Sequence, residues 1–170
     1  MTNIDFMESL FSIETYRKEL EQNPCKNIDE TFYGMCEEFH EVEYKIKNSD
    51  IDGIINELGD LLWYVLMFSL ITKIKIIKII KNLSVPININ ASVNNAIANS
   101  FSTMKRKHRG DYANESYYSN FKPTIKVFTG YILDTAFKNQ IPMSRIIEQN
   151  KEKISSRNKR KTISGHGDFR

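Results

Sequence analysis

The sequence predicts an all-α protein with a single domain over residues 1–170. Only 7 glycines and 4 prolines occur, which is few for a fold with many turns between strands. Several stretches place apolar residues every three or four positions, the period of one face of an α-helix. A hydrophobic share of 41% and a charged share of 26% are typical of globular proteins and argue against disorder.

The first two predicted helices are the easiest to delimit. The first spans residues 3–22, because Asn23-Pro24 breaks the pattern. The second spans residues 28–47, with Asn27 as its N-cap and Glu30 three residues later, as in a capping box. Its apolar face is spaced by four, three and four residues and consists of Met35, Phe39, Val42 and Ile46.

A polar loop over residues 48–53 precedes the third predicted helix, which begins near 52–54 with Asp50 or Asp52 as its cap. The far end of this helix is not defined by the pattern. The run 72–81 fits a helix and a strand almost equally well, and we favour a helix because no breaker occurs before Asn82.

The second half of the chain is less regular. Ser92 is a candidate cap for a helix over 93–107, and residues 111–122 are expected to form a polar loop rich in aromatic residues. Pro123 is expected to open the next helix. The remaining predicted elements are a helix over 124–139, a last helix over 143–157 and a basic, glycine-containing tail over 158–170.

Charge is distributed unevenly along the chain. Residues 1–60 contain 15 acidic and 5 basic residues, a net charge of −10, whereas residues 61–170 contain 6 and 19, a net charge of +13. The acidic part indicates cation ligands or a solvated surface. The basic part indicates phosphate, nucleic acid or the acidic part of a second subunit as a partner.

The sequence also indicates where the protein works. The two cysteines, Cys25 and Cys36, are too few for a disulfide framework and favour a reducing compartment. The N-terminus lacks a basic stretch followed by an apolar one. The longest apolar run, residues 61–72, is shorter than the roughly 20 residues of a membrane helix. We therefore expect a cytoplasmic protein with no membrane contact.

Two pairs of carboxylates point to chemistry. Glu38 and Glu41 are three residues apart, as are Glu57 and Asp60, so each pair projects from one side of its predicted helix. A short loop joins the two helices and should make them antiparallel, which brings the pairs face to face. Four converging carboxylates repel one another unless a cation is present, and oxygen ligands suit Mg²⁺, with Mn²⁺ as an alternative. A solvated acidic face is the simpler explanation for either pair taken alone.

A di-iron site is a weaker alternative. Glu37 and His40 form the Glu-x-x-His motif of such bundles, which require a second copy on another helix. A glutamate would have to precede His108 or His166 by three residues, and those positions hold Lys105 and Ile163.

These carboxylates resemble the signature of the all-α nucleoside triphosphate pyrophosphohydrolases, a superfamily that includes the MazG proteins. The matching pattern is Glu37-Glu38-x-x-Glu41, fifteen intervening residues and Glu57-x-x-Asp60. Gly34 and the run Gly59–Tyr64 are also similar to MazG. At the C-terminus, Asn150, Lys153 and Arg157 resemble the family's closing helix, and residues 165–170 resemble its Gly-x-Gly-Asp-x-Arg tail, with His166 and Phe169 departing from the usual residues.

The resemblance covers residues 28–70 and 128–170. It implies an all-α bundle in which 72–122 is an insertion of some fifty residues, and a homodimer or dimer of dimers. It also implies hydrolysis of the α–β bond of nucleoside triphosphates, with deoxynucleotides the expected substrates, to a monophosphate and pyrophosphate. Under this interpretation Glu38, Glu41, Glu57 and Asp60 hold the metal.

The resemblance also implies roles for other side chains. Glu37 is an added ligand or a base that orients water, and it joins Glu38 as a candidate catalytic residue. The basic C-terminal residues are expected to clamp the triphosphate, and two aromatic residues near the carboxylates are the best candidates to stack on the base. The expected substrate-binding residues are Asn150, Lys153, Arg157, Tyr33, Trp63, Gly165, Gly167, Asp168 and Arg170.

A non-catalytic helical module that binds nucleic acid or a protein partner through its basic half is the competing interpretation. The run Lys105–Arg109 lies near several tyrosines, a combination that binds single-stranded nucleic acid in some proteins. A patch of this size is more often a solvated surface, so a nucleic-acid partner is not expected. This module would bind polyanions in a salt-sensitive way and would not depend on Glu38 or Glu57.

Overall fold

A computed structural model describes residues 3–22, 27–80, 89–111 and 117–159. Helices account for most of these residues, and no strand occurs among them, which confirms the predicted fold class. The elements in chain order are α1 (Asn3–Leu20), α2 (Ile28–Lys47), α3 (Ile51–Ile71), α4 (Ile76–Ile80), α5 (Ile89–His108), the 3₁₀ helix η1 (Tyr118–Phe121), α7 (Lys122–Lys138) and α8 (Met143–Lys159).

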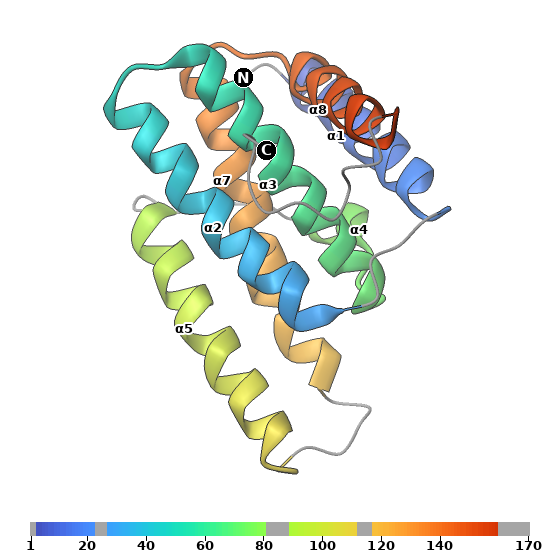
Figure 1. The fold of residues 1–170 in the computed structure, drawn as a ribbon, viewed down its shortest axis with the longest axis vertical. Helices are drawn as coiled ribbons and strands as arrows, with labels where there is room; N and C mark the ends of the chain where they lie inside the picture. The colour runs from blue at the N-terminus through green and yellow to red at the C-terminus, as the bar shows by residue number, and fades with distance from the viewer. Residues whose placement is uncertain (1–2, 23–26, 81–88, 112–116, 160–170) are drawn as a thin grey trace.

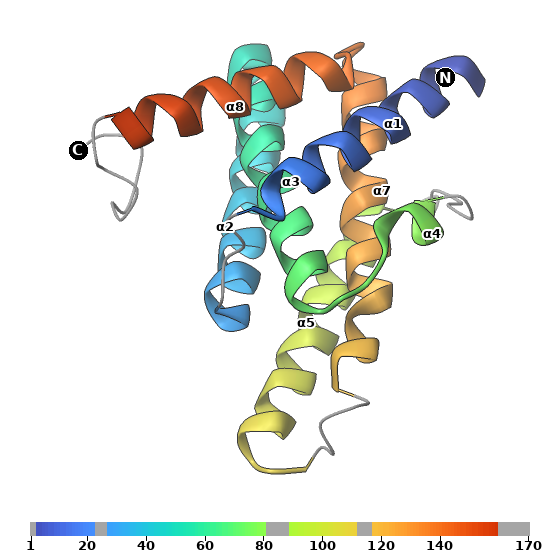
Figure 2. The ribbon, with the colours of Figure 1, turned by 90° about the vertical axis from the view of Figure 1, so that its right-hand side faces the viewer.

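Four long helices, α2, α3, α5 and α7, run along the length of the molecule (Figure 1). The chain reverses direction between α2 and α3, and again between α5 and α7, so each pair is antiparallel. Helices α1 and α8 lie side by side across the upper part of this bundle in Figure 2. Helix α8 also contacts α3, and this contact places the C-terminal helix over the acidic part of the bundle.

The α2–α3 hairpin begins and turns as its caps predict. The side chain of Asn27 accepts hydrogen bonds from the main-chain N–H groups of Asp29 and Glu30, at 3.0 and 3.1 Å. Asp50, one of two candidates for the second cap, accepts from the N–H of Gly53 at 2.9 Å. Each cap satisfies main-chain donors that the first turn of a helix leaves without a partner.

Helix α3 forms the centre of the core. By length and composition it is apolar enough to cross a membrane, but 72% of its most apolar window is buried within the protein. Most of its leucines are buried, and its Phe68 packs against Phe32 of α2 and Phe121 of η1, at centroid distances of 5.8 and 5.1 Å. Burial inside the bundle therefore accounts for the apolar character of this helix.

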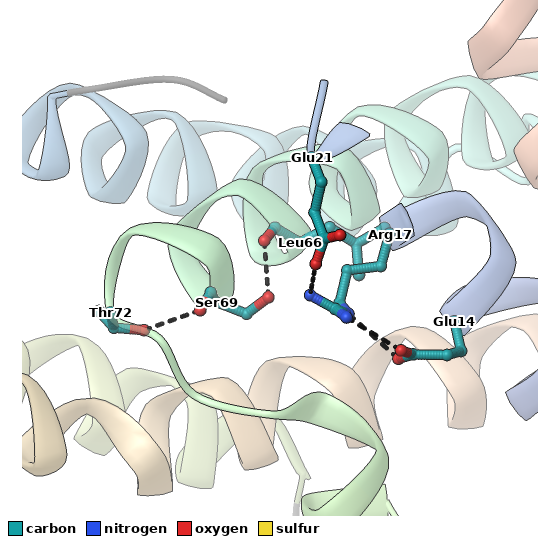
Figure 3. Close-up of polar contacts among 6 residues, drawn as sticks. All are labelled: Glu14, Arg17, Glu21, Leu66, Ser69 and Thr72. Carbon is teal, nitrogen blue, oxygen red and sulfur yellow. Dashed lines mark hydrogen bonds and ion pairs between the residues drawn. The ribbon is translucent and has the colours of Figure 1, made fainter. Parts of the chain in front are cut away.

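The prediction of a helix over 72–81 was partly wrong. Helix α3 ends at Ile71, and the short helix α4 begins only after a turn. The hydroxyl group of Ser69 donates to the main-chain carbonyl of Leu66 at 2.6 Å (Figure 3). The hydroxyl group of Thr72 donates to the carbonyl of Phe68 at 2.7 Å and makes a longer contact of 3.4 Å with the carbonyl of Ser69, which Figure 3 also shows. Lys73 then adopts a positive φ of 56°, which ends the helical path without a glycine or proline.

An ion-pair network covers the last turns of α1 near this turn (Figure 3). The guanidinium of Arg17 lies 3.0 Å from Glu14 and 2.7 Å from Glu21. Arg17 lies about one helical turn from each glutamate, so the two pairs stabilise the end of α1. The helix stops at Leu20, two residues before the predicted end.

Two further boundaries in the second half differ from the predictions. Ser92 is not a cap, because α5 begins at Ile89 and contains it. In the expected loop 111–122, the structure describes Tyr117 and Phe121 as buried, 4% and 0% exposed. Their rings pack edge to face at 5.2 Å, and this aromatic contact anchors the connection to α7 in the core.

Candidate metal centre and active site

Three glutamates meet where α2 faces α3. Glu38 and Glu41 come from α2 and Glu57 from α3, and one carboxylate oxygen of each lies within 4.8 Å of the others. The antiparallel hairpin produces this arrangement, because it places the predicted carboxylate pair of α2 opposite the pair of α3 along the helix axes. The structure thus brings together three of the four residues expected to hold a metal.

Asp60, the fourth expected ligand, lies one turn beyond Glu57 and is engaged by α8. The amide nitrogen of Asn150 lies 2.6 Å from its Oδ1 atom, and the ammonium of Lys153 lies 2.6 Å from Oδ2. Asn150 is 3% exposed. The C-terminal helix therefore positions Asp60 at the edge of the acidic group, which we call the acidic cluster (Glu38, Glu41, Glu57 and Asp60).

Glu38 is the electrostatic centre of the acidic cluster. Burial raises its pKa to about 9, and the charges of Asp60, Glu41 and Glu57 add to the effect, while Lys153 opposes it. Its Oε2 atom is buried and has no hydrogen-bond partner among the described residues. Without a cation, this carboxyl group holds a proton at neutral pH.

These features fit a hard divalent cation. The ligand atoms are all carboxylate oxygens, which Mg²⁺ and Mn²⁺ prefer. A buried Glu38 oxygen with no described partner, and a raised pKa caused by burial and by neighbouring carboxylates, are features that a positive charge at this position would satisfy.

Two residues that the sequence analysis did not single out also adjoin the acidic cluster. The ammonium of Lys45 lies 3.9 Å from Glu57 and 3.4 Å from Asp50. The hydroxyl of Tyr16 donates to Oδ1 of Asn150 at 2.5 Å, and burial together with the charge of Asp60 raises its pKa. The spacing of Lys45, one turn after Glu41, could have indicated from the sequence that it lies near the acidic cluster. No local sequence pattern indicates that Tyr16 contacts Asn150.

The approach of α8 depends on a glycine. A Cβ atom at Gly59 would lie 3.0 Å from the Cβ of Asn150 and 3.3 Å from the carbonyl oxygen of Ile146. Both distances are tighter than ordinary van der Waals contact. The absence of a side chain at Gly59 thus allows Asn150 to reach Asp60.

Three other predicted site residues lie on α2 and α3, outside the group of three glutamates. Glu37 is exposed on α2 and is not part of the group of three glutamates. Tyr33 is 53% exposed and stacks on Phe101 of α5, with centroids 6.0 Å apart. Trp63 is half-buried and packs edge-on against Tyr64 at 4.8 Å.

The remaining candidates are the C-terminal residues expected to bind substrate and the histidine considered for a di-iron site. Arg157 is partly exposed on α8, one turn after Lys153. Residues 165–170, including Gly165, Gly167, Asp168 and Arg170, lie outside the described residues. His108 lies 3.3 Å from Asp29 in the first turn of α2, eight residues before Glu37, which argues against a shared iron site with Glu37.

Comparison with protein families confirms the resemblance for part of the chain. Residues 27–85 match the model of the MazG nucleotide pyrophosphohydrolase domain. The match begins at the cap of α2 and includes the whole acidic cluster, and it continues to residue 85, into the segment expected to be an insertion. No curated protein and no solved structure matched the chain.

Proposed function

We propose that the chain is a nucleotide pyrophosphohydrolase that cleaves the α–β bond of nucleoside triphosphates, releasing a monophosphate and pyrophosphate. The observation that supports this most strongly is the convergence of Glu38, Glu41 and Glu57 within the segment that matches the MazG domain. A hydrolase of this type needs concentrated negative charge to hold a cation against the phosphates.

The acidic cluster would hold the cation, which we propose to be Mg²⁺. Bound there, a divalent cation neutralises phosphate charge and lowers the pKa of a bound water. Glu38 would serve as a ligand in its ionised form, which a nearby positive charge would favour over the protonated form that burial and the neighbouring carboxylates stabilise. Glu37, exposed and adjacent on α2, is proposed to orient the attacking water.

The basic face of α8 is proposed to hold the triphosphate. Lys153 already lies beside the acidic cluster, and Arg157 follows one turn later on the same helix. Arg157 can donate two parallel hydrogen bonds to a phosphate, whereas Lys153 supplies a point charge. Both positive charges would stabilise the negative charge that develops on the transferred group.

The base and sugar are proposed to lie toward the aromatic residues of the α2–α3 hairpin. Tyr33 offers an exposed ring and Trp63 a partly exposed one. Stacking on a ring tolerates every base, so we expect a preference for deoxynucleotides to depend on contacts to the sugar. A homodimer or dimer of dimers is part of the proposal because the resemblance to MazG proteins implies it, and the opposite charges of the acidic and basic parts of the chain are compatible with such packing.

Product analysis tests this proposal. Purified protein with Mg²⁺ is incubated with each ribonucleoside and deoxynucleoside triphosphate, and the products are separated by anion exchange. We expect monophosphate and pyrophosphate from the wild type and none from Glu38→Gln, which removes the charge without changing the volume. Glu148→Gln, the same change at an exposed position of α8, is the matched control and should retain activity.

The same experiment distinguishes the competing interpretation. Turnover that persists in Glu38→Gln would reject the metal site, and diphosphate plus inorganic phosphate would reject cleavage at the α–β bond. A folded wild-type protein that converts no nucleotide would instead favour a binding module, whose affinity for polyanions should then fall with increasing salt.

A further inference from the structure

Helix α1 lies outside the segment that matches the MazG domain, yet it contributes a buried side chain to the surroundings of the acidic cluster. Tyr16 is 2% exposed, and its hydroxyl group lies 2.5 Å from Oδ1 of Asn150. Asn150 in turn donates through Nδ2 to Oδ1 of Asp60 at 2.6 Å. A continuous line of hydrogen bonds therefore joins three helices, from α1 through α8 to α3.

The direction of these bonds determines how the amide of Asn150 is oriented. An asparagine side chain has an acceptor at one end and two donors at the other, and the two ends have nearly the same shape. If the amide were reversed, its carbonyl oxygen would face the carboxylate of Asp60. The carboxylate of Asp60 accepts from the NH₂ group, and the bond that Tyr16 donates to the oxygen holds the other end of the amide at α1.

Fixing Asn150 also fixes Asp60. One oxygen of Asp60 is held by Asn150, and the other faces Lys153. Partners of metal-binding carboxylates orient the ligand, and their loss typically weakens metal binding about 10- to 100-fold. Resting on the proposed function, we infer that Tyr16 is a positioning residue of the metal site, acting through Asn150 to orient Asp60.

The chain contains a matched control for the loss of a buried tyrosine hydroxyl. Tyr131 on α7 is 1% exposed, and its hydroxyl donates to Glu43 on α2, which is not one of the clustered glutamates. Phenylalanine keeps the ring at either position and removes only the hydrogen bond. The two variants should therefore lose similar stability but differ in their effect on the metal site.

Titration with Mn²⁺ in the absence of nucleotide measures this difference, using the electron paramagnetic resonance signal of free Mn²⁺. We expect Tyr16→Phe to bind Mn²⁺ roughly ten-fold more weakly than the wild type, the lower end of the range for groups bonded directly to a ligand, because Tyr16 acts one hydrogen bond further away. Tyr131→Phe should bind as the wild type does. Equal affinity for Tyr16→Phe and wild type, or an equal loss in both variants, would overturn the inference.

A double-mutant cycle tests whether Tyr16 acts through Asn150. In an Asn150→Ala background, Tyr16→Phe should cause no further loss of Mn²⁺ affinity, because the link to Asp60 is already broken. Additive losses would overturn the inference while leaving the proposed metal site in place. A wild-type protein that binds no Mn²⁺ would reject the proposed function itself, and the inference with it.

Discussion

Lys153 of α8 forms an ion pair with Asp60 of α3, with 2.6 Å between Nζ and Oδ2 and side chains that are only 19% and 12% exposed. This lysine places a positive charge beside the acidic cluster. It lowers the pKa of Glu38, against the effect of the three neighbouring carboxylates. The C-terminal helix thus supplies part of the charge that a cation would supply.

Replacing Lys153 should therefore make the protein more dependent on metal. We expect Lys153→Met to lower the free energy of unfolding in EDTA by about 2 kcal/mol, between the values for surface and buried pairs. Added Mg²⁺ should raise the melting temperature of this variant more than that of the wild type. Thermal and urea unfolding with and without Mg²⁺ measure both effects.

Lys138→Met is the control for this prediction. Lys138 also pairs with an aspartate, Asp134 at 2.7 Å, but its side chain is 66% exposed and lies on α7. Its loss should cost less than about 1 kcal/mol. If Mg²⁺ stabilised the Lys153 and Lys138 variants equally, Lys153 would not contribute to the charge balance of the acidic cluster.

The contact between Gly59 and α8 leads to a second prediction. Gly59→Ala should destabilise the protein by about 1–3 kcal/mol, because the added methyl group would press against Asn150 and the main chain of Ile146. Catalysis should fall as well, since α8 would move away from Asp60. Urea unfolding and pyrophosphate release measure the two consequences.

A Gly59→Ala variant that is not destabilised would contradict the close contact between α3 and α8. Alanine is the better helix former by about 1 kcal/mol, so a site with free space should become more stable on this substitution. A Gly59→Ala variant as stable and active as the wild type would therefore show that α8 does not approach α3 as closely as the structure indicates.

The titration of Glu38 predicts how stability depends on pH. Its pKa is raised to about 9 in the folded protein, from an ordinary value of 4.5, so the folded state binds a proton that the unfolded state has lost. Its contribution to stability is fully present below pH 4.5 and is lost as the pH rises toward 9. We expect the free energy of unfolding in EDTA to decline over this window.

Glu38→Gln removes this titration and provides the comparison. The variant should be more stable than the wild type at pH 8, and its stability should change less between pH 5 and pH 8 (~1.4 kcal/mol accompanies each unit of pKa difference at full effect). Parallel curves for the two proteins, from urea unfolding at several pH values, would mean that Glu38 has an ordinary pKa.

Local sequence was sufficient to predict the α2–α3 hairpin. The bounds of α2 agree with the prediction, because a side-chain cap at Asn27 and an apolar face of period 3.6 act within a few residues of one another. The spacing of the carboxylates likewise places Glu38 and Glu41 on one side of a helix. These features depend on helix geometry alone, so they were accessible before the tertiary structure.

Packing decided what the local pattern left open. The end of α3 at Ile71 depends on hydroxyl groups that bond back to the preceding turn, and Tyr117 and Phe121 are buried because other helices cover them. The tertiary structure also brings Tyr16 to Asn150 and Asn150 to Asp60, across 134 and 90 positions of the chain. Hydrogen bonds over such separations leave no periodic signal in the sequence, since they depend on how whole helices pack.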